Sequence, residues 1–243
     1  MGCDVRPLVI LTATVTPSTS SALSLSDPNE RRAQYCSAAK WWREEGDRGA
    51  FDVLLAENSG DDISAWLPPG VEGLRCAVPM TPERGKGDGE AGILRDVLGK
   101  EGKRLLERPW VAKCTGRLTV AKPSDVLPIA LGSAAFVSCR PSPQFSEVDA
   151  RFVVASPSVW EGHLLAFAAE IDDRSGHYLE HAFAKGVNSA LLAGVEFIPF
   201  RRVPRFRGAS GTSGLKYNSL KMRVAAAVED TANAARRWGQ RRM

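Results

Sequence analysis

Polar side chains follow two apolar stretches of this sequence, at positions where they could bind a nucleotide. Residues 8–15 and 51–56 are rich in apolar and β-branched residues, and each stretch leads into a polar loop. In an open parallel sheet, the loops at the carboxyl ends of the strands hold the ligand. We therefore predict a nucleotide-type site where these two stretches end. Its polar residues are Thr12 and Thr14 in the first stretch, Glu57, Asn58 and Ser59 in the second, and Asp61 and Asp62 just beyond.

A glycine-rich segment, residues 81–90, leads into a predicted helix and could bind phosphate. Backbone N–H groups at a helix N-terminus attract anions, and Lys86 adds a positive charge. The segment lacks the closing Lys-Ser/Thr pair of a P-loop and the G-x-G-x-x-G pattern of a dinucleotide site. A flexible loop without a ligand is the alternative interpretation of this segment taken alone.

The C-terminal fifth of the chain is strongly basic, although the net charge is only +4. Arginines flank the glycine- and serine-rich loop 208–214, so phosphate binding and a solvated surface are both open interpretations there. For the last six residues we favour a solvated tail. The cations of the region are Arg201, Arg202, Arg205, Arg207, Lys216, Lys221, Arg223, Arg236, Arg237, Arg241 and Arg242.

An alternation of strands and helices must position these residues. Asp27, Pro28 and Glu30 form a helix-start pattern of capping acid, first-turn proline and first-turn acid, which predicts a helix running towards Gly46. Strand, helix and strand in this order predict an α/β fold with a parallel sheet. Further strands are predicted at 74–78, 110–114, 134–139, 151–155 and 195–198, and further helices at 90–106, 158–171, 178–192 and 215–238.

Composition narrows the class of protein. With 243 residues and 44% hydrophobic content, the chain can bury one large core, so we expect a single domain. The five cysteines form no C-x-x-C pair and lie near no histidine cluster, which argues against a disulfide framework and a zinc site and favours a reduced cytoplasm. No apolar run approaches the roughly 20 residues of a membrane span. Nucleic-acid binding is disfavoured because no aromatic residues alternate with the basic ones.

The order of these motifs resembles that of bacterial glycosyltransferases of the GT-A fold, in a family-2-like form. The resemblance runs over roughly residues 8 to 185 and rests on four segments: Leu11–Thr14, Glu57–Gly60, Gly85–Gly87 with Glu90 after it, and Lys113–Arg117. It implies a Rossmann-like, mostly parallel open sheet flanked by helices, in a single domain. Residues 8–120 would be the nucleotide-binding half, 121–200 the acceptor half, and 201–243 a basic loop and C-terminal helix.

The resemblance also implies a set of donor-binding residues. In typical members the turn after the second strand holds the base and ribose, which matches Glu57, Asn58 and Ser59. An Asp-x-Asp motif usually holds a divalent metal where this chain has Thr115-Gly116-Arg117. Because an arginine can neutralise a diphosphate directly, we expect transfer that requires no metal, with Mg²⁺ or Mn²⁺ left open. The expected donor-binding residues are Thr12, Thr14, Glu57, Asn58, Ser59, Lys86, Lys113, Thr115, Gly116, Arg117, Arg205 and Arg207.

An acidic residue near the start of a late helix serves as the base in the enzymes that this chain resembles. Glu180 matches that position, with His181 or His177 beside it and Asp172 or Asp173 as alternatives. Removal of a proton from an acceptor hydroxyl needs such a carboxylate within hydrogen-bond reach. The other interpretation is that Glu180 and His181 lie in the first turn of an amphipathic helix, where the helix dipole favours an acid.

These expectations point to an inverting glycosyltransferase that moves a sugar from a nucleotide-sugar donor to a glycan or lipid-linked acceptor, for a cell-surface polysaccharide. The alternative is a non-catalytic module that binds a nucleotide or a glycan on the same fold. We expect a cytoplasmic protein without a nucleic-acid partner. Contact of the basic C-terminal segment with the inner face of a membrane is left open.

Overall fold

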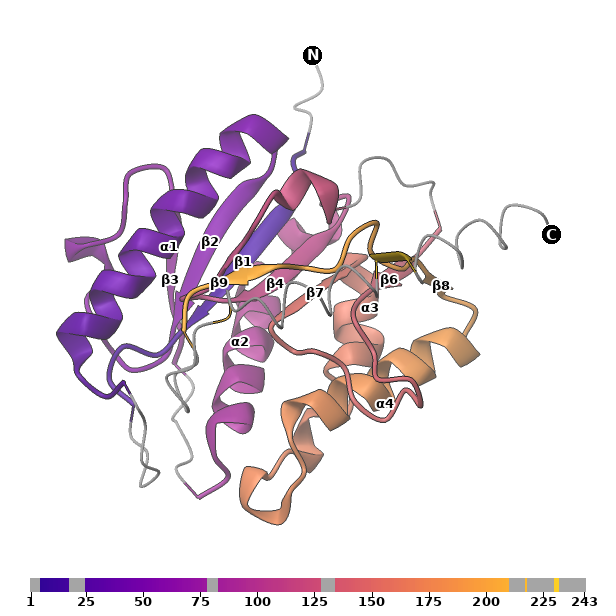
Figure 1. The fold of residues 1–243 in the computed structure, drawn as a ribbon. Coiled ribbons are helices and arrows are strands. Elements are labelled where there is room, and N and C mark those ends of the chain that lie inside the picture. The colour runs from indigo at the N-terminus through magenta and orange to yellow at the C-terminus, as the bar shows by residue number, and fades with distance from the viewer. Residues whose placement is uncertain are drawn as a thin grey trace.

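A computed structural model describes residues 5–17, 25–77, 83–127, 134–209, 217 and 230–231 of the chain (Figure 1). The strands are β1 (Leu8–Ala13), β2 (Asp52–Glu57), β3 (Glu72–Arg75), β4 (Val111–Thr115), β5 (Thr119–Val120), β6 (Phe136–Ser138), β7 (Phe152–Ala155), β8 (Glu196–Phe197) and β9 (Phe206–Arg207). The α-helices are α1 (Pro28–Gly49), α2 (Lys86–Leu106), α3 (Pro157–Val159) and α4 (Leu179–Leu192). Short turns of helix are η1 (Ile63–Ala65), η2 (Pro123–Asp125), η3 (Trp160–Leu164), η4 (Ala168–Glu170) and η5 (Asp173–Ser175).

The main sheet has seven strands in the order β3-β2-β1-β4-β7-β6-β8. Strands β3, β2, β1 and β4 are parallel to one another, β7 is antiparallel to β4 and β6, and β8 is parallel to β6. A second, two-stranded sheet pairs β5 with β9. The predicted fold class, a mostly parallel α/β sheet flanked by helices, is confirmed. The division at residues 120 and 200 stays a prediction.

Both faces of the sheet are buried, which explains the continuous apolar stretches. On β1, Leu8 and Ile10 pack with the α2 and α4 side, whereas Val9 and Leu11 pack with α1 on the other side. Trp42 of α1 is fully buried and stacks on Phe152 at 6.1 Å between ring centroids. A strand covered on both faces cannot alternate apolar with polar residues.

The predicted helix starts are confirmed for α1 and α4, whereas α2 begins about one turn before the predicted start at residue 90. The side chain of Asp27 accepts a hydrogen bond from the Asn29 N–H and caps α1 as expected. Helix α2 begins at Lys86, inside the glycine-rich segment. The predicted helix at 215–238 lies almost wholly outside the described residues, as do the loop residues 210–214 and the cations from Lys216 onwards.

The prediction of one helix over 158–171 was wrong. Helix α3 ends at Val159, and the wider turn η3 and the 3-10 turn η4 follow it. The wide turn buries Trp160 and Leu164, and the Trp160 Nε1 donates a hydrogen bond to the Val111 carbonyl of β4 at 3.0 Å. Burial of a large aromatic residue with its polar atom satisfied here outweighs regular helix geometry.

Gly186 of α4 lets this wide turn approach the helix, which generates a stability prediction. A Cβ at Gly186 would lie 2.7 Å from the His163 carbonyl oxygen and from Leu164 Cα, both backbone atoms that cannot rotate away. We expect Gly186→Ala to lower the free energy of unfolding by about 1–3 kcal/mol, measured by urea denaturation. The matched control is Gly99→Ala in α2, where a Cβ meets nothing within 4 Å and about 0.4–1 kcal/mol should be gained. Equal effects of the two substitutions would contradict this account of the packing.

Candidate functional site

The loops after β1 and β2 lie side by side at one edge of the sheet, as the sequence predicted. The Thr14 hydroxyl donates to Asn58 Oδ1 at 2.7 Å, and the Thr16 N–H donates to Ser59 Oγ at 2.9 Å. The parallel pairing of Ala13 with Glu57 brings the two strand ends together. The polar residues of both stretches therefore share one site, and they bind one another within it.

Glu57 fixes this arrangement. Its carboxylate has no exposed surface and accepts hydrogen bonds from the Val15 N–H at 3.0 Å, the Ser59 N–H at 2.8 Å and the Asp61 N–H at 3.2 Å, as well as from the Ser59 hydroxyl. A buried carboxylate needs such donors in place of water. Glu57 thus holds both loops in shape, and its oxygens are occupied by the protein.

The α1 side of the same edge carries two arginines around Tyr35. Arg31 donates to the Thr14 carbonyl oxygen from Nε at 2.8 Å, and its guanidinium lies 5.8 Å from the Tyr35 ring centroid. Arg117, after β4, lies over the same ring at 5.9 Å and donates to Gln34 Oε1 at 3.3 Å. The Arg117 Nε is buried without a hydrogen-bond partner among the described residues. Arg117 therefore keeps unused hydrogen-bonding capacity.

Gly116 brings the ends of β1 and β4 into close contact. Its N–H donates to the Thr12 carbonyl oxygen at 3.0 Å, and a Cβ at this position would lie only 2.6 Å from that oxygen. The position thus requires a glycine, because the backbone of β1 occupies the space of a side chain. This contact sets Arg117 beside the β1 loop.

On the α2 side of the edge lies a buried ion pair. Lys113 of β4 has no exposed surface, and its ammonium lies 2.7 Å from Glu90 Oε1 and 3.3 Å from Thr115 Oγ1. It also donates to the Ala150 carbonyl oxygen. Thr12 Oγ1 donates to the same Glu90 oxygen at 2.6 Å. The three ammonium protons of Lys113 have protein acceptors, so Lys113 supports the site from beneath the surface.

Glu180, the predicted base, lies in the first turn of α4 and is half buried. Burial raises the pKa of its carboxyl group above the ordinary value of 4.5, and the negative charge of Glu90 adds to the rise. A hydrogen bond from the backbone N–H of Glu180 itself lowers this pKa, as do the positive charges of Lys113 and Lys86. Glu180 is thus within electrostatic range of the Glu90–Lys113 ion pair.

The two histidines near Glu180 have structural contacts. His181 Nδ1 accepts a hydrogen bond from the Tyr178 N–H at 3.1 Å, and its Nε2 lies 3.4 Å from Glu147 Oε1. The His181 ring also stacks on Tyr178 at 5.5 Å. His177 lies in the turn before α4, where its backbone pairs with Asp172. Neither contact places an imidazole against the Glu180 carboxylate.

The predicted phosphate-binding segment is occupied by a carboxylate of the chain itself. Asp173 Oδ2 accepts a hydrogen bond from the Gly87 N–H at 2.9 Å, and a Cβ at Gly85 would lie 2.6 Å from Asp173 Oδ2. Arg84 ties the same two segments together through the Ile171 carbonyl at 2.9 Å. Lys86 is exposed, and its charge acts on the carboxyl groups of Glu90 and Glu180.

Asp172, the other alternative base, caps the short turn η5. It accepts hydrogen bonds from the Ser175 hydroxyl at 2.8 Å and from the Arg174 N–H at 3.0 Å. The Ser175 hydroxyl is the main cause of a lowered pKa of the Asp172 carboxyl group, and a base with a lowered pKa accepts a proton less readily.

The arginines of the C-terminal region that the structure describes lie on β9 and just before it. Arg205 forms an ion pair with Asp230 at 3.1 Å, and Asp230 also accepts a hydrogen bond from the Val203 N–H. Arg207 of β9 is exposed. Arg151, bound to Asp149 at 2.7 Å, lies between the rings of Phe206 and Tyr217 at 4.5 and 4.8 Å. These contacts hold β9 and Tyr217 against the strand that delivers Arg151.

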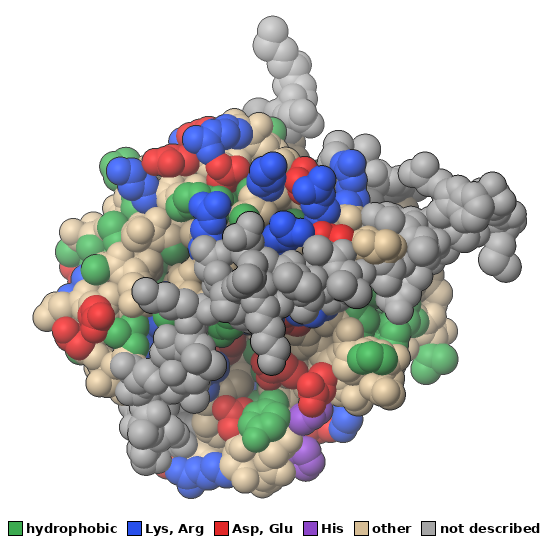
Figure 2. All heavy atoms as spheres, in the orientation of Figure 1, with side chains coloured by type: hydrophobic (Ala, Val, Ile, Leu, Met, Phe, Trp, Pro, Cys, Tyr) green, Lys and Arg blue, Asp and Glu red, His purple; other side chains and the backbone are tan. Residues whose placement is uncertain are grey.

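Figure 2 shows how charge is distributed over the face seen in Figure 1. Many lysine and arginine side chains lie in its upper part with acidic side chains among them, while acidic and histidine side chains lie together in its lower part, where further lysine or arginine side chains are seen at the edge. In the described part of the chain, no group of three or more histidine, cysteine, aspartate or glutamate side chains could hold a metal ion. No helix in that part is long and apolar enough to span a membrane.

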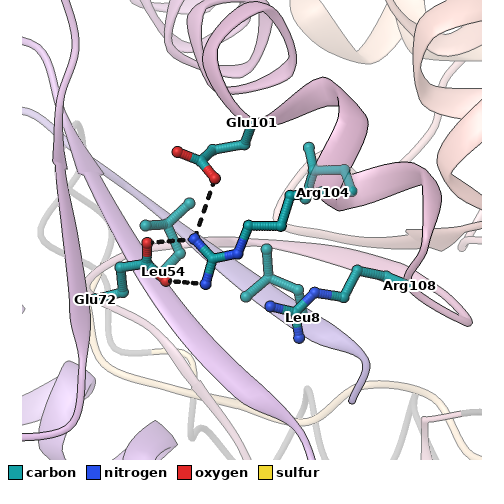
Figure 3. A pocket seen from close by; sticks show the side chains of 7 residues that line it. Leu8, Leu54, Glu72, Glu101, Arg104 and Arg108 are labelled. Atoms are coloured by element: carbon teal, nitrogen blue, oxygen red, sulfur yellow. Dashed lines mark hydrogen bonds and ion pairs between the residues drawn. The ribbon is translucent and has the colours of Figure 1, made fainter. Parts of the chain in front are cut away.

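A recess at the opposite end of the strands can be set aside. It is lined by Leu8, Leu54 and the ion-paired side chains of Glu72 and Arg104 (Figure 3). The guanidinium of Arg104 also contacts Glu101. The recess has room for no more than about one water molecule, so a nucleotide does not fit.

Comparison with known proteins adds little to this geometry. No protein-family model matches the chain, and no curated protein is similar to it in sequence. Among solved structures, one from Desulfovibrio desulfuricans G20, described as a "putative nucleotide-diphospho-sugar transferase", aligns over 79% of both chains at 12% identity with a TM-score of 0.45. At this level of similarity it carries no argument about activity.

Glu90 is the residue of this site to which the sequence assigned no role. Its position after the glycine-rich segment marked the resemblance, but the segment drew attention to phosphate and to Lys86. The signal available was an acid in the first turn of a helix together with a lysine in a predicted buried strand, which needs a partner.

The role of Glu57 generates a second stability prediction. In Glu57→Gln, one acceptor oxygen becomes an NH2 group that faces N–H donors, so at least one buried N–H loses its partner. We expect the free energy of unfolding to fall by about 1–3 kcal/mol in urea denaturation. Glu101→Gln, which alters an exposed ion pair, should change it by less than about 0.5 kcal/mol. If the Glu57→Gln protein were as stable as the Glu101→Gln protein, the hydrogen bonds of the Glu57 carboxylate would not contribute to stability.

Proposed function

We propose that this chain is a glycosyltransferase that uses a nucleotide-sugar donor. The observation that carries the proposal is the half-buried Glu180 carboxyl group with a raised pKa, within electrostatic range of an ionised Glu90 that contacts the ends of β1 and β4. Two acids in one site with pKa values moved in opposite directions are suited to different roles. Glu180 is suited to accept a proton, and Glu90 to remain charged.

The proposed reaction is a single displacement with inversion at the anomeric carbon. Glu180 takes the proton of an acceptor hydroxyl, whose oxygen attacks the anomeric carbon of the donor sugar. The bond from that carbon to the diphosphate oxygen breaks, and the nucleoside diphosphate leaves with the electron pair. The acceptor would be a glycan or a lipid-linked glycan of a cell-surface polysaccharide.

The nucleotide would lie over the β1 and β2 loops, with its diphosphate near Arg117 and Lys86. The Arg117 guanidinium, whose Nε has no partner among the described residues, suits a diphosphate, which an arginine binds by charge-assisted hydrogen bonds. The donor set does not fit a divalent metal: Thr115-Gly116-Arg117 has no carboxylate, and Glu90 is paired with Lys113. No step of the proposed reaction therefore uses a metal.

One observation favours a second function, that of a non-catalytic nucleotide- or glycan-binding module. The N-terminus of α2, which could bind phosphate, is filled by Asp173. A module of this kind would bind the donor nucleotide or the glycan without transferring a sugar, and the Glu180 variant below distinguishes the two functions.

Donor binding is tested by a thermal-shift panel of nucleoside mono- and diphosphates, with and without Mn²⁺. A ligand that binds the native state raises the apparent melting temperature. We expect a nucleoside diphosphate to stabilise the protein and a chelator to change this little. Arg117→Ala should weaken diphosphate binding by roughly tenfold or more, because a hydrogen bond between charged groups contributes about 1.5–3 kcal/mol.

The matched control for Arg117→Ala is Arg104→Ala at the opposite end of the strands (Figure 3), which should leave nucleotide binding unchanged. Arg117→Lys keeps the charge without the planar fork and should bind with intermediate affinity. Loss of all binding on addition of the chelator alone would refute the arginine-based site.

Catalysis is tested with Glu180→Gln, which keeps the shape of the side chain and removes the proton acceptor. We expect kcat to fall by about 10²–10⁴ while donor affinity stays within about twofold. Because the pKa of the Glu180 carboxyl group is raised, the wild-type rate should fall on acidification at a pH above the ordinary 4.5 of a glutamate. The residual rate of Glu180→Gln should lack this acid limb. A fully active Glu180→Gln variant would show that another residue is the base. If the wild-type protein bound the donor but did not transfer the sugar, the binding module would be favoured.

A further inference from the structure

Glu90 uses one carboxylate oxygen for the contacts that it makes in the described part of the chain. The hydrogen bond from Thr12 at 2.6 Å, the Lys113 ammonium at 2.7 Å and the Thr115 hydroxyl at 3.4 Å all fall on Oε1. Within the described residues, no hydrogen bond or ion pair is formed by Oε2. A carboxylate offers about four acceptor positions, so Glu90 retains capacity for a ligand donor.

The surroundings keep Glu90 charged. Burial opposes ionisation, but the charges of Lys113 and Lys86, with hydrogen bonds from Lys113 and Thr12, outweigh it and lower the pKa of the carboxyl group. Oε2 is therefore a permanent acceptor, fixed in place by contacts on Oε1.

The place of Glu90 in the fold puts this acceptor on the sugar side of the proposed site. Glu90 contacts the ends of β1 and β4, which the β1 loop and Arg117 follow, and its charge acts on the pKa of the Glu180 carboxyl group. A group bound between a diphosphate near Arg117 and an acceptor near Glu180 would be the sugar that is transferred.

We propose that Glu90 Oε2 binds a hydroxyl group of the donor sugar and selects an uncharged, hydroxyl-bearing ring over a uronate. This inference rests on the proposed function. A carboxylate accepts hydrogen bonds only, so it matches a hydroxyl donor. A sugar carboxylate in the same position would set two like charges together, and one of them would have to take up a proton.

The test measures the binding of the sugar separately from the binding of the nucleotide. Titration calorimetry would compare UDP with UDP-glucose, UDP-galactose, UDP-N-acetylglucosamine and UDP-glucuronate, and GDP with GDP-mannose. For the wild type we expect at least one uncharged sugar nucleotide to bind about tenfold more tightly than its parent diphosphate, and UDP-glucuronate to gain nothing over UDP. In Glu90→Gln, affinity for the parent diphosphate should stay within about twofold, while the gain from the sugar and the discrimination against the uronate should largely disappear.

Glu90→Gln leaves the buried Lys113 without its counter-ion and could fail to fold. The double variant Glu90→Gln/Lys113→Met removes both charges together and serves as the second measurement. Glu72→Gln is the matched control at the opposite end of the strands, where the same substitution removes an ion-paired carboxylate (Figure 3) and should leave all affinities unchanged.

The outcomes separate this inference from the proposed function. Equal losses for the diphosphate and its sugar conjugate would make Glu90 a purely structural residue. Two other results would overturn the inference while the nucleotide site stands. In the first, wild-type protein binds the sugar conjugates no more tightly than their parent diphosphates. In the second, the gain in affinity from the sugar is the same in Glu90→Gln as in the wild type. Wild-type protein that binds neither UDP nor GDP nor any sugar conjugate would overturn the proposed function, and this inference with it.

Discussion

The ion pair between Lys113 and Glu90 holds the functional edge of this protein together. Removal of two charges from water costs several kcal/mol per ion, and only good geometry with further hydrogen bonds compensates for it. The protein meets this condition with Thr12 from β1, Thr115 from β4 and the Ala150 carbonyl before β7. One buried pair therefore sets the N-terminal half of α2 against the ends of three strands. Any change in the position of α2 would break a bond to a buried charge.

Most charged groups of the edge are used in this way. Glu57 binds backbone N–H groups, Asp61 forms an ion pair with Arg32 at 2.6 Å, and Asp173 binds the N-terminus of α2. These side chains stabilise the shape of the loops, so few charged groups remain to bind a ligand. Arg117 and the Oε2 atom of Glu90 differ from these groups because their bonding capacity is incomplete within the described residues. Rigid loops with a small number of unused polar atoms are what a site needs for selective binding.

The sequence predicted the framework better than the role of each residue. Apolar stretches and helix-start patterns located β1, β2, α1, α2 and α4, because local chemistry decides these elements. The wide turn at Trp160 could not be found, since it depends on a hydrogen bond to β4, 49 residues away. Lys113 and Glu57 were expected to bind a ligand because they are polar residues at strand ends. Whether such a residue faces the ligand or the interior depends on partners such as Glu90 and Ser59, which only the folded chain brings together.

The reversed direction of β7 has a consequence for protein engineering. Because β7 runs against β4, the residues that precede it, and not those that follow it, reach the functional edge: the Ala150 carbonyl accepts from Lys113, and the Arg151 carbonyl from the Thr115 N–H at 3.0 Å. Ala155, at the other end of β7, pairs with Val111 at the start of β4. A fluorophore attached in the segment 140–148 would thus lie nearer the proposed ligand than one attached just after Ala155. An insertion at the latter position would lengthen the molecule at its far end.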